Sequence, residues 1–541
     1  MTPRPPTWCR RLPRSGRAEE LVEPGAWEGR AAGAGLRGEC THMKSSVPLQ
    51  ESGLAGGARA LESLTTTELA AALRERHVTA VEVLDAFLAR ARAHNPALNA
   101  LVTWDEAQAR KRAEEADAAL ARGELWGPLH GVPFTVKDAF STAGLRTTSA
   151  HPAFAEYVPA QDATVVARLK AAGAILFGKT NLPPFAGDFQ TDGPLWGRTN
   201  NPHDLGRTPG GSSGGAAAAV AAGLTPFEVG SDIGGSIRQP AHCCGIVGIK
   251  PTEHRVSTFG HIPDPPGGPR HVRHMACAGP LARSVADVRL ILSLIEGADP
   301  RAPEVPPVVP VGAAKPRALK GLRLAWADTL GPFQADRETR ELFQRFIAAA
   351  SAEGVVVEQA VPPGQDFADL VEVWGLMEGA EVGAPLPPPV REGYQQQFLP
   401  YERDLLAKAI VQGTRVDMTG YGTALSRRDV HIGLLEDFLS GWDAWLVPVA
   451  MTAAPPHTPF GAPLDVDGVP SDYLEAFGGF TCLFNATGSP VVVFPLGRTS
   501  AGLPVGAQLV GRRWADGALL DVAEALLPLG GGVRWPAAFT P

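Results

Sequence analysis

Two serines stand in glycine-rich clusters whose composition suits acyl-transfer chemistry. The clusters read Gly-Gly-Ser-Ser-Gly-Gly over residues 210–215 and Asp-Ile-Gly-Gly-Ser over residues 232–236. A serine hydroxyl attacks a carbonyl carbon once a base removes its proton, and N–H groups must then stabilise the negative oxygen. Consecutive glycines let the backbone N–H groups from Ile233 to Ser236 turn toward one point. Because Ser236 lies within that turn, the second cluster predicts a nucleophile beside an oxyanion hole.

The first cluster has three other interpretations, and each is weaker. A flexible linker is disfavoured because an apolar Ala-rich helix follows at once and strands are expected on both sides. A phosphate-binding loop is disfavoured because no Lys-Ser/Thr pair follows the glycines and GxGxxG is not matched. Residues 210–214 match the G-x-S-x-G nucleophile elbow, but that elbow follows a buried strand, whereas residues 201–209 are polar and broken by proline. We therefore interpret the elbow match as accidental.

Lys137 is the candidate base for a serine nucleophile. It stands near the end of an apolar segment, where a lysine either extends to solvent or is held neutral by burial, and only the neutral amine accepts a proton. His242 is near Ser236 in sequence, but on a sharply turning chain this does not indicate contact, so we interpret it as structural. Asp232 and Arg238 flank the second cluster and either brace the turn or form an ordinary surface ion pair.

Helix signals open the part of the chain that is expected to be ordered. Thr65–Glu68 and Thr79–Glu82 both have the T-x-x-E form of a capping box. The second helix is expected to stop at His94-Asn-Pro96, because the residue before a proline disfavours helical geometry. The charged, Ala-rich run 105–122 predicts a third helix with a solvated face.

Short apolar segments then alternate with Ala-rich helical segments from Leu129 onward. This alternation predicts an α/β fold, with a sheet covered by helices on both faces. The Pro-rich stretch 300–316 is expected to be a surface connection. Strands are expected at 131–138, 174–177, 227–229, 246–249, 323–326, 490–495 and 506–510, and helices at 162–172, 216–222 and 338–352.

Composition excludes several classes of protein. The chain has 541 residues, of which 44% are hydrophobic and 20% charged, so it is not globally disordered. A net charge of −8 argues against a general nucleic-acid binder, and no apolar run reaches the ~18–20 residues of a membrane-spanning helix. Six cysteines without a CxxC pair indicate a reduced cytoplasmic protein with no disulfide framework and no zinc site.

Residues 1–60 differ from the rest of the chain. They are rich in Arg, Gly, Ala and Pro with little apolar periodicity, so we expect disorder. An equally good explanation is a start codon assigned too far upstream, since Met43 offers a later start. The Arg10-Arg11 pair is not followed by an apolar segment, which argues against an export signal.

Taken together, the motifs resemble the amidase signature family of serine hydrolases. The resemblance covers residues 61–541, with a catalytic core at about 129–290. It implies one large α/β/α domain with a mixed central sheet, and an amidase that needs no metal or organic cofactor. It is carried by GVPFTVKD (131–138), GKTN (178–181), GGSSGG (210–215), DIGGSIRQP (232–240), CGIVGIKPT (244–252), GPLARSVAD (279–287) and GLPVGAQLVG (502–511).

The resemblance also implies a role for each residue of a Ser–Ser–Lys triad. Ser236 is the acyl nucleophile, Ser212 is a bridging serine typically held by a cis peptide bond, and Lys137 is the terminal base and acid. Ser213 helps to orient Lys137. The implied oxyanion donors are the backbone N–H groups of Ile233, Gly234, Gly235 and Ser236.

Aromatic residues suggest where a substrate would bind. Phe185 and Phe189 could line the acyl pocket, whereas Trp196 is better explained by core packing. The variable substrate-pocket region at about 370–430 favours an apolar or aryl substrate. Small apolar amides, anilides and carbamates all remain open. The aromatic and sulfur-containing residues of this region are Trp374, Met377, Tyr394, Phe398 and Tyr401.

The family also contains a rival of a different class, one of the protein components of the glutamine-dependent Glu/Asp-tRNA amidotransferase (its A component). After residues 178–181 this chain lacks the acidic, Met/Gly/Ser-rich stretch of that component. We therefore expect a free-standing amidase of small-molecule amides, with a homodimer as the oligomeric state that the resemblance suggests. A binding protein with an inactive site is disfavoured because all three triad positions are intact.

Overall fold

The computed structural model describes residues 59–262 and 270–541. Contacts divide the chain into two units, Met1–Arg59 and Ala60–Pro541. The predicted disorder of residues 1–60 concerns a segment that lies, except for its last two residues, outside the described part. The larger unit holds every residue proposed for the site.

The described residues form fifteen α-helices and fifteen strands. The helices are α1 (Thr66–Arg74), α2 (Ala80–Leu98), α3 (Glu106–Ala121), α4 (Thr164–Ala171), α5 (Gly214–Ala221), α6 (Arg238–Cys244), α7 (Val285–Ile295), α8 (Arg337–Ala352), α9 (Phe367–Glu378), α10 (Pro388–Phe398), α11 (Leu405–Gly413), α12 (Met418–Leu439), α13 (Tyr473–Gly478), α14 (Cys482–Ala486) and α15 (Asp516–Leu526). The strands are β1 (Leu101–Trp104), β2 (Pro133–Lys137), β3 (Ile175–Thr180), β4 (Phe227–Asp232), β5 (Val247–Lys250), β6 (Cys277–Ala282), β7 (Arg323–Trp326), β8 (Thr329–Leu330), β9 (Phe333–Gln334), β10 (Val356–Gln359), β11 (Ala444–Pro448), β12 (Leu464–Val466), β13 (Val469–Ser471), β14 (Val491–Arg498) and β15 (Pro504–Val510).

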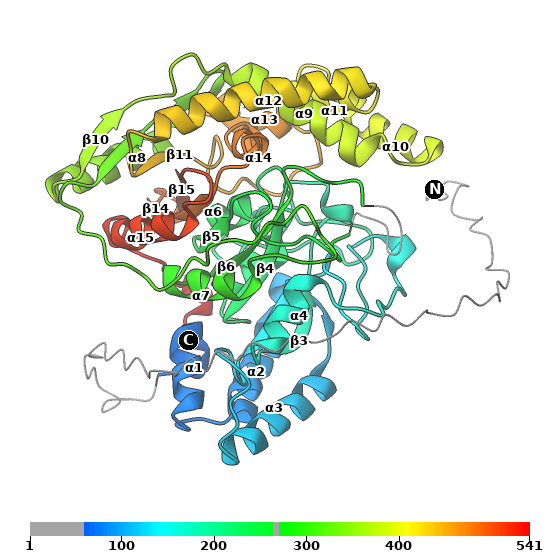
Figure 1. Ribbon diagram of the computed structural model, residues 1–541, viewed down its shortest axis with the longest axis vertical. Helices are drawn as coiled ribbons and strands as arrows, with labels where there is room; N and C mark the ends of the chain where they lie inside the picture. The colour runs from blue at the N-terminus through cyan, green and yellow to red at the C-terminus, as the bar shows by residue number, and fades with distance from the viewer. Residues whose placement is uncertain (1–58, 263–269) are drawn as a thin grey trace, which may run out of the picture. The chain divides into compact units, whose positions relative to one another are not determined.

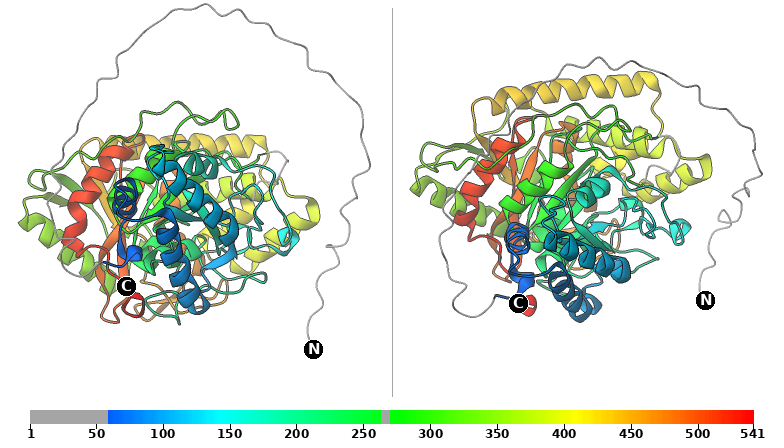
Figure 2. Two further views of the ribbon diagram at one scale, coloured as in Figure 1. Left: turned by 90° about the horizontal axis from the view of Figure 1, so that it is seen from below. Right: turned by 60° about the horizontal axis from the view of Figure 1, so that its bottom comes forward.

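A mixed sheet of eight strands forms the centre, in the order β10-β7-β11-β15-β14-β5-β6-β4. The β10–β7 and β7–β11 pairs are parallel, and the other neighbours are antiparallel. The predicted α/β fold with a mixed sheet is therefore confirmed. In Figure 1 this sheet lies between α9–α12 at one end and α1–α3 at the other, and the right-hand view of Figure 2 keeps the same separation.

Helices cover both faces of the large sheet. Successive side chains of a strand point to opposite faces, so one strand contributes to the packing on both. On β14, Val492 and Phe494 join the core packed against α7, α8 and α15. Val493 instead packs with residues of α5 and α6, and Val491 with residues of α9, α11 and α14. Strands such as β11 and β15 are buried on both sides, as their apolar sequences require, whereas the edge strand β10 is mostly exposed.

Lys137 lies outside the large sheet, on a separate three-stranded sheet of order β1-β3-β2. Its strand β2 pairs in parallel with β3, where Lys137 is opposite Thr180. Strand β2 also lies against β4, and the rings of Phe134 and Phe227 stack there with centroids 5.4 Å apart. The sequence predicted the strand but not this division into two sheets.

Most predicted elements are present, and one predicted boundary is wrong. Both capping boxes form, with Thr65 and Thr79 as the N-caps of α1 and α2. Helix α2, however, continues through Pro96 to Leu98. The proline removes a single donor in the last turn, and the helix ends where Asn99 adopts left-handed geometry (φ 51°) and its N–H donates to the Asn95 carbonyl (2.7 Å).

Candidate active site

The Lys137 side chain ends among three serine hydroxyls. It is fully buried, and its Nζ lies 2.7 Å from Ser212 Oγ, 2.9 Å from Ser213 Oγ and 3.0 Å from Ser231 Oγ. In the described residues no carboxylate forms an ion pair with it. The amine is therefore held by neutral oxygens alone, in a position where a proton can pass to or from Ser212.

Burial changes the acidity of this amine. Desolvation lowers the pKa of Lys137 to about 7, while the carboxylates of Asp232 and Glu228 oppose the shift. At neutral pH a large fraction of Lys137 is therefore the free amine, the form that can accept a proton.

Ser212 belongs to a tight loop that leads into α5. The Gly211–Ser212 peptide bond is cis, as the resemblance implied. A Cβ on Gly211 would lie 2.6 Å from the backbone of Phe189, and one on Gly214 would lie 2.2 Å from Thr191 Oγ1. These approaches require glycine and explain the composition of the first cluster.

Ser236 lies between β4 and α6, and 6% of it is exposed. The Ser213 N–H donates to the Ser236 carbonyl at 3.1 Å, which joins the two clusters. Among the described residues no hydrogen bond links the hydroxyls of Ser236 and Ser212. The structure thus brings the predicted triad into one region, with the Lys137–Ser212 contact formed.

The loop before Ser236 turns its carbonyls away from the site. The Ile233 carbonyl accepts from Trp374 Nε1 (2.8 Å), and the Gly234 carbonyl accepts from Thr481 Oγ1 (2.6 Å). In the part of the chain that the structure describes, the N–H groups of Ile233, Gly234 and Ser236 donate to no protein acceptor. They remain able to donate to an oxyanion.

The N–H of Gly235, also predicted as an oxyanion donor, already has an acceptor in the protein. This N–H donates to Asp232 Oδ1 at 2.9 Å. The carboxylate competes for this donor because it is buried directly behind the turn. Gly235 also provides the backbone conformation, with φ at 128° and room for no Cβ: such an atom would lie 2.5 Å from Thr481 Oγ1.

Asp232 and Arg238 form a buried pair rather than a surface one. Their closest atoms are 2.8 Å apart and both side chains are fully enclosed. Asn485 Nδ2 donates to Asp232 (2.9 Å), and Arg238 also donates to Gln508 Oε1 (2.7 Å) and to the Thr481 carbonyl (2.9 Å). Burial raises the pKa of Asp232, but the Arg238 guanidinium outweighs this effect and holds the pKa well below its usual value. The pair therefore fixes the turn as a charged, fully hydrogen-bonded unit.

The two phenylalanines predicted for the pocket lie in different surroundings. Phe189 is buried, stacks on Phe477 (5.7 Å between centroids) and approaches Gly234. Phe185 instead stacks on His151 at 4.2 Å and contacts Phe154, so its observed ring contacts lie outside the triad.

The structure assigns structural contacts to two further aromatic residues. Trp196, predicted to pack in the core, is partly buried against the small cluster of Ala139, Ala150 and Leu182, and it donates to Thr148 Oγ1 (3.0 Å). His242 is buried, accepts from the Gly506 N–H at Nδ1 (2.9 Å) and lies 3.1 Å from the Thr452 carbonyl at Nε2. Its ring nitrogens are thereby engaged with backbone.

Ser231 and Thr481 escaped the sequence analysis, which names Trp374 only as an aromatic residue of the substrate-pocket region and not as a partner of the oxyanion loop. Ser231 precedes the second cluster, and its position on β4 puts it beside Lys137. Thr481 and Trp374 hold the oxyanion loop from segments more than 100 residues away. Only Ser231 carried a local signal, as a serine one residue before Asp232.

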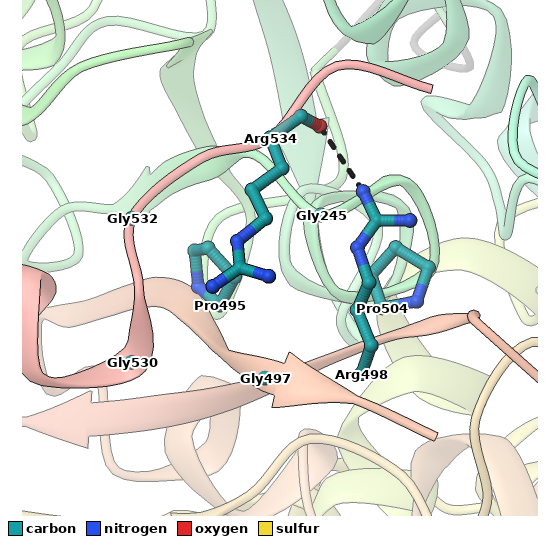
Figure 3. Close-up of a pocket in the computed structure, with 8 residues that line it drawn as sticks. All are labelled: Gly245, Pro495, Gly497, Arg498, Pro504, Gly530, Gly532 and Arg534. Carbon is teal, nitrogen blue, oxygen red and sulfur yellow. Dashed lines mark hydrogen bonds between the residues drawn. The ribbon is translucent and has the colours of Figure 1, made fainter. Parts of the chain in front are cut away.

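A surface pocket lies elsewhere and contains none of these residues. It is lined by glycines, prolines and two arginines, Arg498 and Arg534, and Figure 3 shows Arg498 donating to the Arg534 carbonyl.

The helices of the described ranges include no candidate for a membrane-spanning segment.

Comparisons with known proteins agree on one family. Residues 82–520 match the family model named Amidase. The chain is 37% identical to the A component of the glutamyl-tRNA(Gln) amidotransferase of Roseiflexus sp. (strain RS-1), over 86% of this chain and 96% of that protein. It is 34% identical to the indoleacetamide hydrolase of Bradyrhizobium diazoefficiens, over 85% and 86%. A bacterial aryl acylamidase structure superimposes with a TM-score of 0.74 at 25% identity, covering 86% of this chain and 96% of that one.

Proposed function

This chain belongs to the amidase signature family and is an amide-hydrolysing enzyme, and from that premise we propose that it works alone on small amides through Ser236, Ser212 and Lys137. The observation that carries the proposal is the buried Lys137 amine 2.7 Å from Ser212 Oγ. An apolar side chain would cost less to bury at this position than an amine. The burial of Lys137 beside Ser212 therefore supports a catalytic role.

The proposed reaction begins with proton transfer. Neutral Lys137 takes the Ser212 proton while Ser212 takes the proton of Ser236, whose Oγ attacks the amide carbon. This requires the Ser236 side chain to turn onto Ser212. The N–H groups of Ile233, Gly234 and Ser236 then stabilise the tetrahedral oxyanion.

The same relay returns the proton to the leaving amine, so that the C–N bond breaks and an acyl-enzyme remains. Water then attacks the ester, passing its proton to the relay, and the carboxylic acid leaves as Ser236 regains its proton. The pKa of about 7 suits Lys137 to both directions of transfer near neutral pH.

Apolar or aryl amides and carbamates are the proposed substrates. Trp374, Phe189 and Cys482 lie against Gly234 of the oxyanion loop. The ring of Phe477 stacks on Phe189 behind them. Ligand pockets of this composition bury apolar groups and orient them with few polar contacts. The names of the indoleacetamide and aryl acylamide relatives agree with this choice.

The alternative is the A component of a tRNA amidotransferase, which the identity to the Roseiflexus protein supports. A panel of a short aliphatic amide, a p-nitroanilide, an aryl carbamate and glutamine separates the two functions. We expect the purified chain to hydrolyse the anilide or the carbamate, and Ser236→Ala to lose that activity. Hydrolysis of glutamine alone, or only with partner proteins, would instead support the amidotransferase component.

A further inference from the structure

The surface pocket drawn in Figure 3 is basic. Four glycines, two prolines, Arg498 and Arg534 line it, and no aspartate or glutamate is among these residues. We call it the arginine pocket. Arg498 is the last residue of β14 and is opposite Pro504 of β15, whereas Arg534 belongs to the segment that follows α15. Two cationic side chains therefore reach one pocket from separate parts of the fold.

Neither arginine has a counter-charge within the protein. Across the two described ranges, Arg498 and Arg534 form no ion pair with an aspartate or a glutamate. In Figure 3 the two side chains extend in opposite directions alongside one another. Burial lowers the pKa of Arg498, and the charge of Arg534 lowers it further. The second effect is repulsion between like charges, which an anion bound in the pocket would offset.

Hydrogen bonds to carbonyls hold both side chains in place. Arg498 Nη1 donates to the Gly502 carbonyl (3.0 Å), and its Nη2 donates to the carbonyls of Arg534 and Trp535 (3.4 Å each). Arg534 Nε donates to the Gly531 carbonyl (3.4 Å). In the described part of the chain, the two terminal nitrogens of Arg534 donate to no protein acceptor. The cations are thus preorganised without being neutralised, and donors remain for a ligand.

The end of α6 forms another side of the arginine pocket. Gly245 follows the helix with φ at 66°, and a Cβ there would lie 2.8 Å from Pro504. Burial lowers the pKa of His203 to about 4, so this ring is neutral at pH 7. Its Nε2 is 3.0 Å from the Cys244 carbonyl, and its Nδ1 is 3.4 Å from Arg498 Nη1. The Cys244 carbonyl, which would otherwise repel an anion, is therefore already bonded.

A second surface pocket shows that unpaired arginines are not general on this surface. It is lined in part by Asp328, Arg337, Arg340 and Glu341. Arg337 Nε lies 4.0 Å from Glu341, and Arg340 Nη2 lies 3.5 Å from Asp467. The chain as a whole has a net charge of −8, so its average field repels anions. The arginine pocket departs from both patterns, because its cations have no acidic neighbours in the lining.

We propose that the arginine pocket binds a phosphate group, which is either free inorganic phosphate or the phosphate of a small monoester. A phosphate dianion carries two negative charges to match two guanidinium groups, and its oxygens can accept from both N–H forks at once. A carboxylate carries one charge and leaves one cation uncompensated. The inference does not depend on the proposed amide hydrolysis, because the pocket contains no residue of the triad.

Calorimetric titration of the purified full chain at pH 7.5 and low, fixed ionic strength tests the inference. The ligands are inorganic phosphate, methyl phosphate and acetate, and a phosphate monoester carries a charge of about −1.5 to −2 near this pH. We expect at least one phosphate compound to bind about tenfold or more tightly than acetate. Arg498→Gln and Arg534→Gln should each weaken that binding about tenfold or more. Arg337→Gln removes the same charge from the second pocket and should leave the Kd unchanged.

Equal affinities for phosphate and acetate, or no measurable phosphate binding, would overturn the inference. A Kd that neither Arg498→Gln nor Arg534→Gln changes would also overturn it, because the phosphate would then bind elsewhere. Arg534 is exposed, so Arg534→Gln decides the question if Arg498→Gln does not fold. Tighter binding of methyl phosphate would identify a small monoester as the ligand, and tighter binding of inorganic phosphate would identify the free anion. Either result supports the inference.

Discussion

The amine of Lys137 lies 2.7 Å from the hydroxyl of Ser212, although the two residues are 75 positions apart and the strand of Lys137 belongs to a different sheet from the strand that leads to Ser236. One side-chain contact therefore joins the small sheet to the glycine-rich loops of the large one.

Activity should depend on pH through Lys137. Burial lowers the pKa of this amine to about 7, and only the neutral form, which predominates above that value, can serve as a base. We expect kcat/KM to rise as pH increases through about 7 and to fall tenfold per pH unit below it. A pH–rate profile of the best panel substrate measures this, and a flat profile from about pH 5 to 9 would argue against Lys137 as the base.

Removing the buried amine should stabilise the fold while abolishing activity. The unfolded chain binds the lysine proton up to its ordinary pKa, but the folded chain releases it near pH 7, so the stability of the wild type rises with pH between these values. Lys137→Met should raise the free energy of unfolding by about 1 kcal/mol or more at pH 7, with a smaller gain at pH 10. Urea denaturation measures both, and the exposed Lys111→Met is the control.

The serines around Lys137 should differ in their effects. Ser236→Ala and Ser212→Ala remove the nucleophile and its proton relay, and each should lower kcat by about a thousandfold or more. Ser231→Ala removes only a hydroxyl that stabilises the charged amine, so it should lower the pKa of Lys137. We expect kcat to fall about tenfold and the rising limb of the pH–rate profile to move to lower pH. An unmoved limb in Ser231→Ala would show that this hydroxyl does not tune the base.

Adjacent glycines in the oxyanion loop should tolerate alanine differently. At Gly235 the φ of 128° and a Cβ position 2.5 Å from Thr481 Oγ1 force the loop to shift, so Gly235→Ala should lower kcat about a hundredfold or more. At Gly234 the nearest atom to the new methyl is on the Trp374 ring edge, at 3.0 Å, and φ is not positive. Steady-state kinetics should therefore show a smaller loss for Gly234→Ala, and equal losses would contradict this account.

Breaking the buried Asp232–Arg238 pair should unfold the protein more readily. Arg238→Met leaves the Asp232 carboxylate enclosed without its cation, at a cost of about 3–5 kcal/mol. Because the folded pKa of Asp232 is lowered, its contribution is complete above its unfolded pKa and is lost as pH falls toward the folded value. Urea midpoints at pH 7 should show Asp232→Asn/Arg238→Met to be less destabilised than Arg238→Met alone.

Local signals allowed much of the fold to be predicted. Capping boxes located Thr65 and Thr79, because they depend on neighbours within a few residues. Apolar runs located seven of the strands, namely β2, β3, β4, β5, β7, β14 and β15, but not the others. The end of α2 was misplaced, since the cost of Pro96 in the last turn is small compared with the contacts that Asn95 and Asn99 make there.

Distant contacts limited the prediction of the site. The glycine clusters indicated the nest, yet the competition of Asp232 for the Gly235 N–H depends on how the carboxylate turns back. Nothing in the sequence near Ile233 indicates that Trp374 would bond its carbonyl. Hydrogen bonds between segments far apart in sequence have no local pattern, and these contacts decide which donors remain for an oxyanion.

The junction of β2 with β4 also limits the aggregation of the folded protein. Each is the last strand of its sheet, and an unpaired strand edge is a template on which other chains can add strands. Here the two edges cover each other, and side chains complete the seam: Thr135, on the same strand as Lys137, donates to Glu228 at 3.0 Å, and Lys137 contacts Ser231. The residues that place the base beside its serines thereby also cover one edge of each sheet against the addition of further strands.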